Sequence, residues 1–287
     1  MINMKDFVVI VLCHKRPGNT TTPKTLRESG YTGNIILLLD DEDNTIDLYK
    51  QNFSDLIIDT YSKDEYMKLV DAMDTFKDKR CAVYARNACF DIAIKYNYKY
   101  FCQMDDDYTT IPYRFIVNNT LYRSNEVKLD EVFRLYLEFM STSPQIGSVA
   151  FAEPGDFVGG VGSNLNKKLY LHKCMGSWIC FVDRKLHFKG TMNDDVNTYS
   201  LEGSRGQLFY TFNKIMIDTP ATQSVKGGMT DIYLSSGTYR KTFYTVMCCP
   251  SFVKVDIFGH AQFRIHHKFN WKHAYPKLIS SKYKKEA

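Results

Sequence analysis

The chain has 287 residues, of which 44% are hydrophobic and 24% are charged, and its formal net charge at pH 7 is +5. This composition excludes a disordered or fibrous chain and allows one large α/β domain or two small ones. The eight cysteines include no Cys-x-x-Cys pair, so we expect buried thiols of a reducing compartment and neither a disulfide framework nor a zinc finger. No apolar stretch is long enough to cross a membrane, and we expect a cytoplasmic protein.

The first 110 residues alternate between strand and helix patterns. Continuous apolar or β-rich runs predict buried strands over Phe7–Leu12, Asn34–Leu39, Asp55–Asp59 and Tyr100–Met104. End signals and helical spacing predict helices over Thr25–Ser29, Ser62–Met73 and Cys81–Tyr96. Such alternation is typical of a Rossmann-like α/β fold with a mostly parallel sheet and helices on both faces. Sheets of this kind bind ligands at the carboxyl ends of their strands.

The pattern changes after a further predicted helix over Asp130–Ser141. A glycine-rich stretch, Gly155–Gly162, is followed by strand signals without clean alternation with helices. The predicted strands are Trp178–Val182, Thr242–Met247 and Phe252–Ile257. We therefore expect a mixed second part of the same domain, over residues 111–287.

Polar and charged residues follow the predicted strands of the first part. His14 and Arg16 come after the first strand, Asp40 and Asp41 end the second, and Asp105–Asp107 end the last. Adjacent carboxylates repel each other unless a cation neutralises them, so the triplet predicts a Mg²⁺ or Mn²⁺ site. The alternative for the triplet is a solvated acidic turn. For Asp40 and Asp41, contact with ribose hydroxyls and a plain turn are both open.

Two further groups of residues are candidates for chemistry. Asp195, with Asp194 second, is a candidate general base toward a hydroxyl if the reaction is an inverting transfer, although either residue can also be a helix N-cap. Near the C-terminus, if Phe263 and Ile265 face the core of a strand, Arg264 and His266 face the other way. We therefore favour His266 over His267 as an added metal ligand, with a purely structural histidine as the alternative.

Two residues on the helix over Cys81–Tyr96 complete a recognisable set. Its apolar stripe places Arg86 and Asn87 beside the buried face. Together with the acidic triplet, which ends the next predicted strand, they resemble the nucleotide-sugar-binding half of GT-A glycosyltransferases. The resemblance implies a GT-A-like domain over residues 1–287, with a donor half over 1–110 and an acceptor half over 111–287. It also implies that a UDP-sugar diphosphate and its cation bind at Asp105–Asp107.

The resemblance assigns the remaining donor-site residues as well. The residues expected to contact the nucleotide-sugar are His14, Arg16, Asp40, Asp41, Arg86, Asn87, Asp105, Asp106, Trp178 and Arg264. The metal ligands are expected to be Asp105, Asp107 and His266. Trp178 and the glycine-rich stretch would shape the part of the crevice that selects the sugar.

The C-terminal segment from Phe263 to Ile279, with Gly227-Gly228 and Phe243–Met247 before it, resembles the TET/JBP-associated glycosyltransferases encoded by phages. This resemblance implies transfer to the hydroxyl of a 5-hydroxymethylpyrimidine, 5-hydroxymethylcytosine first, in DNA whose target base is flipped out. The basic and aromatic tail suits phosphates and exposed bases, or is a solubilising end. The alternatives are a glycan, lipid-carrier or protein acceptor, a carboxylate-metal nucleotidyltransferase, and a non-enzymatic nucleic-acid-binding module.

Overall fold

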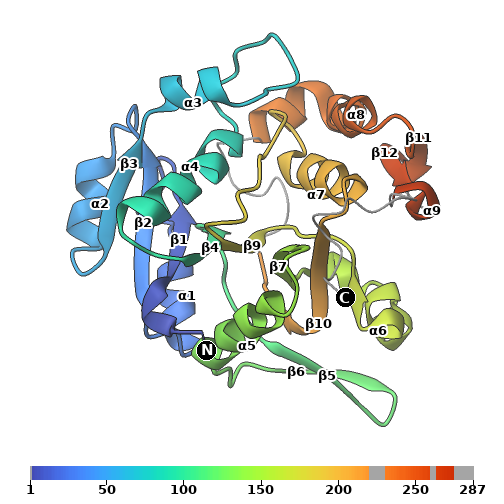
Figure 1. The fold of residues 1–287 in the computed structure, drawn as a ribbon, viewed down its shortest axis with the longest axis horizontal. Helices are drawn as coiled ribbons and strands as arrows, with labels where there is room; N and C mark the ends of the chain where they lie inside the picture. Colours follow the sequence, from blue (N-terminus) through green and yellow to red (C-terminus); the bar gives the residue numbers. More distant parts are fainter. Residues whose placement is uncertain (1, 220–229, 259–262, 275–287) are drawn as a thin grey trace, which may run out of the picture.

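The computed structural model describes residues 2–219, 230–258 and 263–274, and for residues 230–238, 258 and 264 it describes the backbone alone. A mixed β-sheet runs through the molecule in the strand order β3-β2-β1-β4-β9-β7-β10-β5-β6, with β8 paired to β10 (Figure 1). Its strands are β1 (Phe7–Leu12), β2 (Asn34–Asp40), β3 (Ile57–Tyr61), β4 (Tyr100–Asp105), β5 (Tyr113–Val117), β6 (Thr120–Ser124), β7 (Ile146–Ala152), β8 (Tyr170–Leu171), β9 (Ser177–Phe181) and β10 (Leu208–Met216).

Strand direction divides the sheet into two parts. Strands β3, β2, β1 and β4 are all parallel, whereas β9 lies antiparallel between β4 and β7. The chain order reverses at β1, because β2 is its neighbour on one side and β4 on the other. A reversal of this kind opens a crevice at the carboxyl ends of the two parallel neighbours. The largely parallel α/β fold predicted from the sequence is confirmed.

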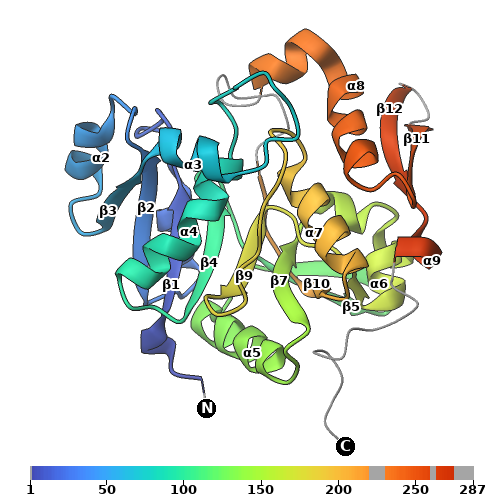
Figure 2. The same cartoon turned by 45° about the horizontal axis from the view of Figure 1, so that its top comes forward.

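Helices cover both faces of the sheet (Figures 1 and 2). They are α1 (Thr22–Glu28), α2 (Ile46–Asn52), α3 (Lys63–Leu69), α4 (Val83–Lys95), α5 (Leu129–Ser141), α6 (Asn164–Lys168), α7 (Asp194–Ser204), α8 (Thr230–Cys248) and α9 (Trp271–Ala274), with 3₁₀ turns at Met4–Asp6, Pro154–Phe157 and Gly160–Gly162. In the part of the chain that the structure describes, no helix is both long and apolar enough to span a bilayer. All eight cysteines are free thiols, and none forms a disulfide.

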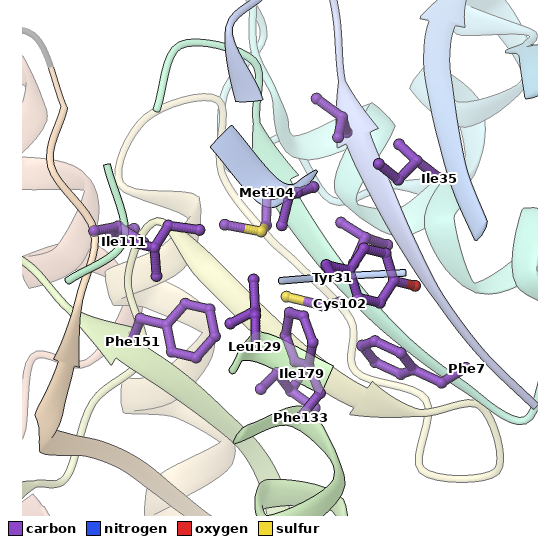
Figure 3. Close-up of a cluster of buried hydrophobic side chains, with 14 of the residues drawn as sticks. Phe7, Tyr31, Ile35, Cys102, Met104, Ile111, Leu129, Phe133, Phe151 and Ile179 are labelled. Atoms are coloured by element: carbon purple, nitrogen blue, oxygen red, sulfur yellow. The ribbon is translucent and has the colours of Figure 1, made fainter. Parts of the chain in front are cut away.

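The hydrophobic core has two layers because alternate residues of β1 point to opposite faces of the sheet. Val9 and Val11 belong to one layer and Val8 and Ile10 to the other. Figure 3 shows the first layer, where the Phe133 ring of α5 packs on Phe7 at a centroid distance of 4.7 Å. Burial on both faces explains why the parallel strands have continuous apolar sequences.

Helix α4 is more deeply buried than its apolar stripe predicts. Arg86 and Asn87 are each only 6% exposed, so their expected position beside the buried face is wrong. The apolar stripe packs on the sheet, while α3 and the segment around Phe188 cover the side that the sequence pattern leaves polar. The polar groups of Arg86 and Asn87 must therefore find partners inside the protein.

Another correction concerns the strand predicted over Thr242–Met247, which is the C-terminal half of α8. Thr242 and Thr245 are buried three residues apart, and the Thr242 hydroxyl donates to the Ile265 carbonyl at 3.1 Å. This helix face packs on the hairpin of β11 (Val253–Phe258) and β12 (Arg264–Phe269), beside α7 (Figure 2). Tertiary packing has overridden the β-propensity of the Thr-Phe-Tyr-Thr-Val run.

Candidate active site

The crevice at the switch point collects the residues that follow β1, β2 and β4. Leu12, the last residue of β1, pairs with Asp105 on one side and with Leu38 on the other. The structure therefore brings the loop after β1, which carries His14 and Arg16, between the end of β2 and the acidic triplet. Strands β1 and β4 are adjacent in the sheet although more than eighty residues separate them in the chain.

The three aspartates at the end of β4 occupy different environments. Asp106 is 1% exposed, and its carboxylate accepts a hydrogen bond from the Arg16 guanidinium. Burial raises the pKa of Asp106 to about 7. The side chains of Asp105 and Asp107 are 41% and 30% exposed, so they open to the crevice. Asp106, predicted to contact the donor, is instead an internal anchor, and the first and third carboxylates are those available to a ligand.

Arg86 links the triplet to α7. Its guanidinium Nε lies 2.7 Å from an Asp194 carboxylate oxygen, and Nη2 lies 3.4 Å from an Asp105 oxygen. Burial by itself would lower the pKa of Arg86, but the charges of Asp105, Asp194 and Asp195 outweigh it and raise the pKa. Arg86 thus remains a cation between the end of β4 and the start of α7. Asn87 instead holds the fold, because its side-chain amide bonds the backbone of Val83 and Phe188.

Asp194 and Asp195 are the first two residues of α7. Burial raises the pKa of Asp194 to about 6, although the Arg86 charge acts to lower it. One Asp195 oxygen accepts the Val196 backbone N–H at 2.7 Å, so this side chain does satisfy a helix N-terminal group. The pKa of Asp105 is raised, chiefly because the surrounding protein reduces its hydration although 41% of the side chain is exposed, and also through the charges of Asp107 and Asp195; the Arg86 charge acts to lower it. Asp105, Asp194 and Asp195 thus share the positive charge of Arg86 where β4 meets α7.

A second acidic group lies at the end of β2. In the described residues, His14, Asp40 and Asp43 are the histidine and carboxylate side chains whose potential ligand atoms all lie within 4.8 Å of one another. Burial alone would raise the pKa of Asp40, but hydrogen bonds from His14 at 2.9 Å and from Lys63 lower it to about 2. The Lys63 ammonium lies 3.0 Å from an Asp40 oxygen, so this carboxylate is already paired with a cation.

Other contacts show that the end of β2 is internally satisfied. Asp43 accepts the Lys15 backbone N–H at 2.8 Å and the Thr45 backbone N–H at 2.8 Å. Asp41 accepts the N–H of Lys63, the first residue of α3, at 3.0 Å. We therefore interpret Asp40, Asp41 and Asp43 as side chains that fix the loops after β1 and β2, with the exposed edge of His14 left toward the crevice.

The C-terminal histidines lie on β12, beside the loop that leads into α7. Their rings stack with centroids 4.3 Å apart, and His267 Nδ1 lies 3.4 Å from the Asn193 side-chain amide. Burial, with the charges of His266 and Lys241, lowers the pKa of His267 to about 3. Among the side chains described, Asp105, Asp107 and His266 do not converge within 4.8 Å, so a cation on the two aspartates would draw its other ligands from elsewhere.

One predicted donor residue, Trp178, does not lie in the crevice. Another, Arg264, and part of the predicted acceptor surface lie wholly or partly outside the described residues. Trp178 is fully buried and packs its ring on Phe188 and Phe209 at 4.8 and 5.9 Å, so it is a core residue and does not line the crevice. The Arg264 backbone belongs to β12, but its side chain lies outside the described part of the chain. Gly227-Gly228 and the tail from Tyr275 onward also lie outside the described residues.

The sequence analysis did not single out Glu153. This residue directly follows β7, and because β7 and β4 are both antiparallel to β9, Glu153 reaches the same edge of the sheet as the triplet. Burial raises the pKa of Glu153 to about 7, and Asp195 and Asp105 are among the charges that act on it. An acidic residue after the apolar run Ile146–Ala152 is the same signal that identifies the triplet, but β7 was not predicted.

The chain is similar to several solved structures and to one protein family. A crystal structure of glucosyl-3-phosphoglycerate synthase from Mycobacterium tuberculosis with Mn²⁺ and UDP matches 95% of this chain and 88% of its own, with a TM-score of 0.46 and 10% identity. A structure of GalNAc-T7 with UDP, GalNAc and Mn²⁺ matches 79% of this chain and 47% of its own, with a TM-score of 0.41 and 8% identity. No curated protein sequence matches the chain. The family described as TET-Associated Glycosyltransferase matches residues 7–228, and the chain therefore belongs to this glycosyltransferase family.

Proposed function

We propose that the protein transfers a sugar from a UDP-sugar to the hydroxyl of a 5-hydroxymethylpyrimidine in DNA, 5-hydroxymethylcytosine first, with the help of Mn²⁺ or Mg²⁺. The observation that carries the donor half is the pair of open carboxylates, Asp105 and Asp107, at the switch point of a glycosyltransferase-family chain. The acceptor half rests on the TET association in the family's description and on the C-terminal resemblance.

The residues at the end of β4 fit a divalent cation. Asp105 and Asp107 flank the buried Asp106 in the sequence and offer hard oxygen ligands, and their side chains are 41% and 30% exposed. Mg²⁺ and Mn²⁺ are commonly held by one or two carboxylates together with substrate phosphates. When bound there, the cation would neutralise the charge that develops on the departing diphosphate.

The protein's own groups then have separable tasks. Arg16 holds Asp106 and keeps the β1 loop against the triplet, while Arg86 holds Asp194 in place. Because Arg86 engages Asp194, Asp195 is the member of this pair left to act near the acceptor hydroxyl, where the sequence analysis expects a general base. His14 and the exposed side of the β1 loop face the nucleotide.

The direct test incubates the protein and Mn²⁺ with 5-hydroxymethylcytosine DNA and a panel of UDP-sugars, and then weighs the digested nucleosides. A mass gain of one sugar residue with at least one donor is the expected result. If no donor adds mass to the DNA, and a glycan, lipid or protein acceptor is glycosylated in a donor-dependent way, the DNA acceptor is rejected in favour of that other acceptor. Unmodified cytosine DNA is the matched control because it lacks the acceptor hydroxyl.

DNA binding provides a second, independent measurement. A DNA acceptor predicts binding to duplex that weakens steeply with added salt, since phosphate contacts release counterions. A carboxylate-metal nucleotidyltransferase would release pyrophosphate, whereas the proposed reaction releases UDP. Membership of a glycosyltransferase family argues against that alternative and against a non-enzymatic binding module.

A further inference from the structure

Glu153 directly follows β7, in the half of the chain that is expected to bind the acceptor, and it belongs to no recognised motif. It leaves β7 at the edge of the sheet that also carries the triplet, because β9 pairs antiparallel with both β4 and β7. Its side chain is fixed by the turn at Pro154–Phe157, where it accepts the Asp156 backbone N–H, while the Asp156 carboxylate accepts the Glu153 N–H at 3.0 Å. This reciprocal pair holds the Glu153 carboxyl in one orientation.

The neighbours of Glu153 connect it directly to the turn after β4. A Cβ added to Gly176 would lie only 2.6 Å from the Glu153 Oε1 atom and 3.0 Å from the Tyr108 hydroxyl. Tyr108 follows the acidic triplet, and its hydroxyl donates to the Gly176 carbonyl at 2.6 Å. The absence of a side chain at Gly176, whose φ of +65° also suits glycine, thus leaves room for the carboxyl next to the Tyr108 hydroxyl, which comes from the turn after the triplet.

The charged groups around Glu153 come from several elements. Lys173, which pairs with Asp156, favours the ionised carboxylate, whereas burial and the charges of Asp156, Asp195 and Asp105 favour the protonated form. Burial is the largest of these influences. A carboxyl group in such surroundings is a much stronger base than a solvated glutamate, which is the property that a general base near neutral pH requires.

We propose that Glu153 is the general base of the transfer and that Asp195 acts on it as a positioning residue through its charge. In this step, which rests on the proposed function and refines its assignment of Asp195, the acceptor O–H bond breaks and its proton moves to a Glu153 carboxylate oxygen. The oxygen's electron pair forms the bond to the anomeric carbon of the sugar. The bond from that carbon to the phosphate oxygen breaks, and its electron pair leaves with UDP.

The test compares Glu153→Gln, Glu153→Asp and Asp195→Asn in the full chain with 5-hydroxymethylcytosine DNA and the most active UDP-sugar. Glu153→Gln should lower kcat by about 100-fold or more, because general-base catalysis contributes about that much. Its affinity for UDP with Mn²⁺, measured by calorimetry, should stay within about twofold, because the residue takes no part in donor binding. Glu153→Asp should recover part of the activity.

The pH profile separates the base from a residue that only supports the fold. In the wild type, kcat/KM should fall as the pH drops below about 7, where Glu153 gains a proton. Glu153→Gln should lose this acidic limb, and Asp195→Asn should move it to lower pH because a nearby negative charge is gone. Glu138→Gln, the same change on the exposed face of α5, is the control and should alter neither rate nor profile.

The outcomes distinguish the two proposals. Near wild-type kcat in Glu153→Gln, or an unchanged acidic limb in that variant, overturns the assignment of the base and leaves the proposed function standing. A wild-type protein that binds no UDP and transfers no sugar overturns both. An acidic limb that vanishes in Asp195→Asn and persists in Glu153→Gln returns the base to Asp195.

Discussion

The two sides of the crevice are built in different ways. On the donor side, three neighbouring strand ends place the functional groups, and contacts between the loops after β1, β2 and β4 fix them. On the other side, the head of α7 is fixed by side-chain contacts with another helix, since the Asn193 side chain bonds the Lys241 carbonyl and the Thr245 hydroxyl of α8. The open carboxylates at the strand ends are partly exposed, whereas the side chains that hold the head of α7 are buried.

This difference leads to four predictions. Substitutions of open donor-side carboxylates should remove activity and leave the fold intact. Substitutions in the α7–α8 region should lower stability and activity together. Arg86 bridges the two sides, and its replacement should have the largest effect.

Replacing Arg86 by methionine should lower the free energy of unfolding by roughly 3–5 kcal/mol, because it leaves the largely buried Asp194 carboxylate without its cation. Equilibrium unfolding in urea measures this loss. Arg134→Met on the exposed face of α5, where Arg134 pairs with Glu138 at 2.8 Å, should change stability by no more than about 1 kcal/mol. Equal losses in the two variants would show that Arg86 does not couple the two sides.

Replacing Asp107 by asparagine should lower sugar transfer by about 100- to 1,000-fold, the usual effect of removing one electrostatic contact to a developing charge. The melting temperature should change little, since Asp107 is partly exposed and its nearest cation, Arg16, lies 3.7 Å away. Transfer assays over a Mn²⁺ titration measure the effect. Asp47→Asn, on the exposed face of α2, should retain full activity, and retained activity in Asp107→Asn would remove the metal assignment.

Replacing Tyr244 by phenylalanine should lower stability by about 1–3 kcal/mol. The Tyr244 hydroxyl donates to Asp74, and the Thr191 hydroxyl, three residues before Asp194, bonds both Asp74 and Tyr244. Transfer should fall as well, because this network positions the loop into α7. Tyr239→Phe, one turn earlier on the exposed side of α8, removes the same hydroxyl and should leave both quantities unchanged.

Acidification should destabilise the α7–α8 side. His267 has a pKa of about 3 in the folded protein and 6.5 as its ordinary value, so below about pH 6.5 the unfolded chain binds the proton that the folded one excludes. His267 should therefore lower stability by about 1–2 kcal/mol between pH 7.5 and 5, against the opposite contributions of carboxyl groups with raised pKa values such as Asp106 and Glu153. His267→Gln should reduce this fall, whereas His273→Gln, an exposed residue of α9, should not; identical pH dependence in all three proteins contradicts the prediction.

Local sequence predicted where the donor-side strands end, because strand ends are local features. Apolar runs located β1, β2 and β4, and their following residues do converge in the structure. Packing around α4 was not predictable from its stripe, because the burial of Asn87 depends on a segment about one hundred residues away. Trp178 illustrates the same limit, since only the three-dimensional arrangement distinguishes a tryptophan of the core from one of a crevice.

The link between Arg16 and Asp106 has a consequence for the entropy of ligand binding. The Asp106 carbonyl also accepts the N–H groups of Thr21 and Thr22, at 2.8 and 3.1 Å, so the loop after β1 is ordered by the turn after β4. Restricting a mobile backbone costs about 1–2 kcal/mol per residue, and here folding has already imposed that restriction. A diphosphate that binds against the loop after β1 should therefore retain most of its contact energy as affinity, since this loop has little conformational freedom left to lose.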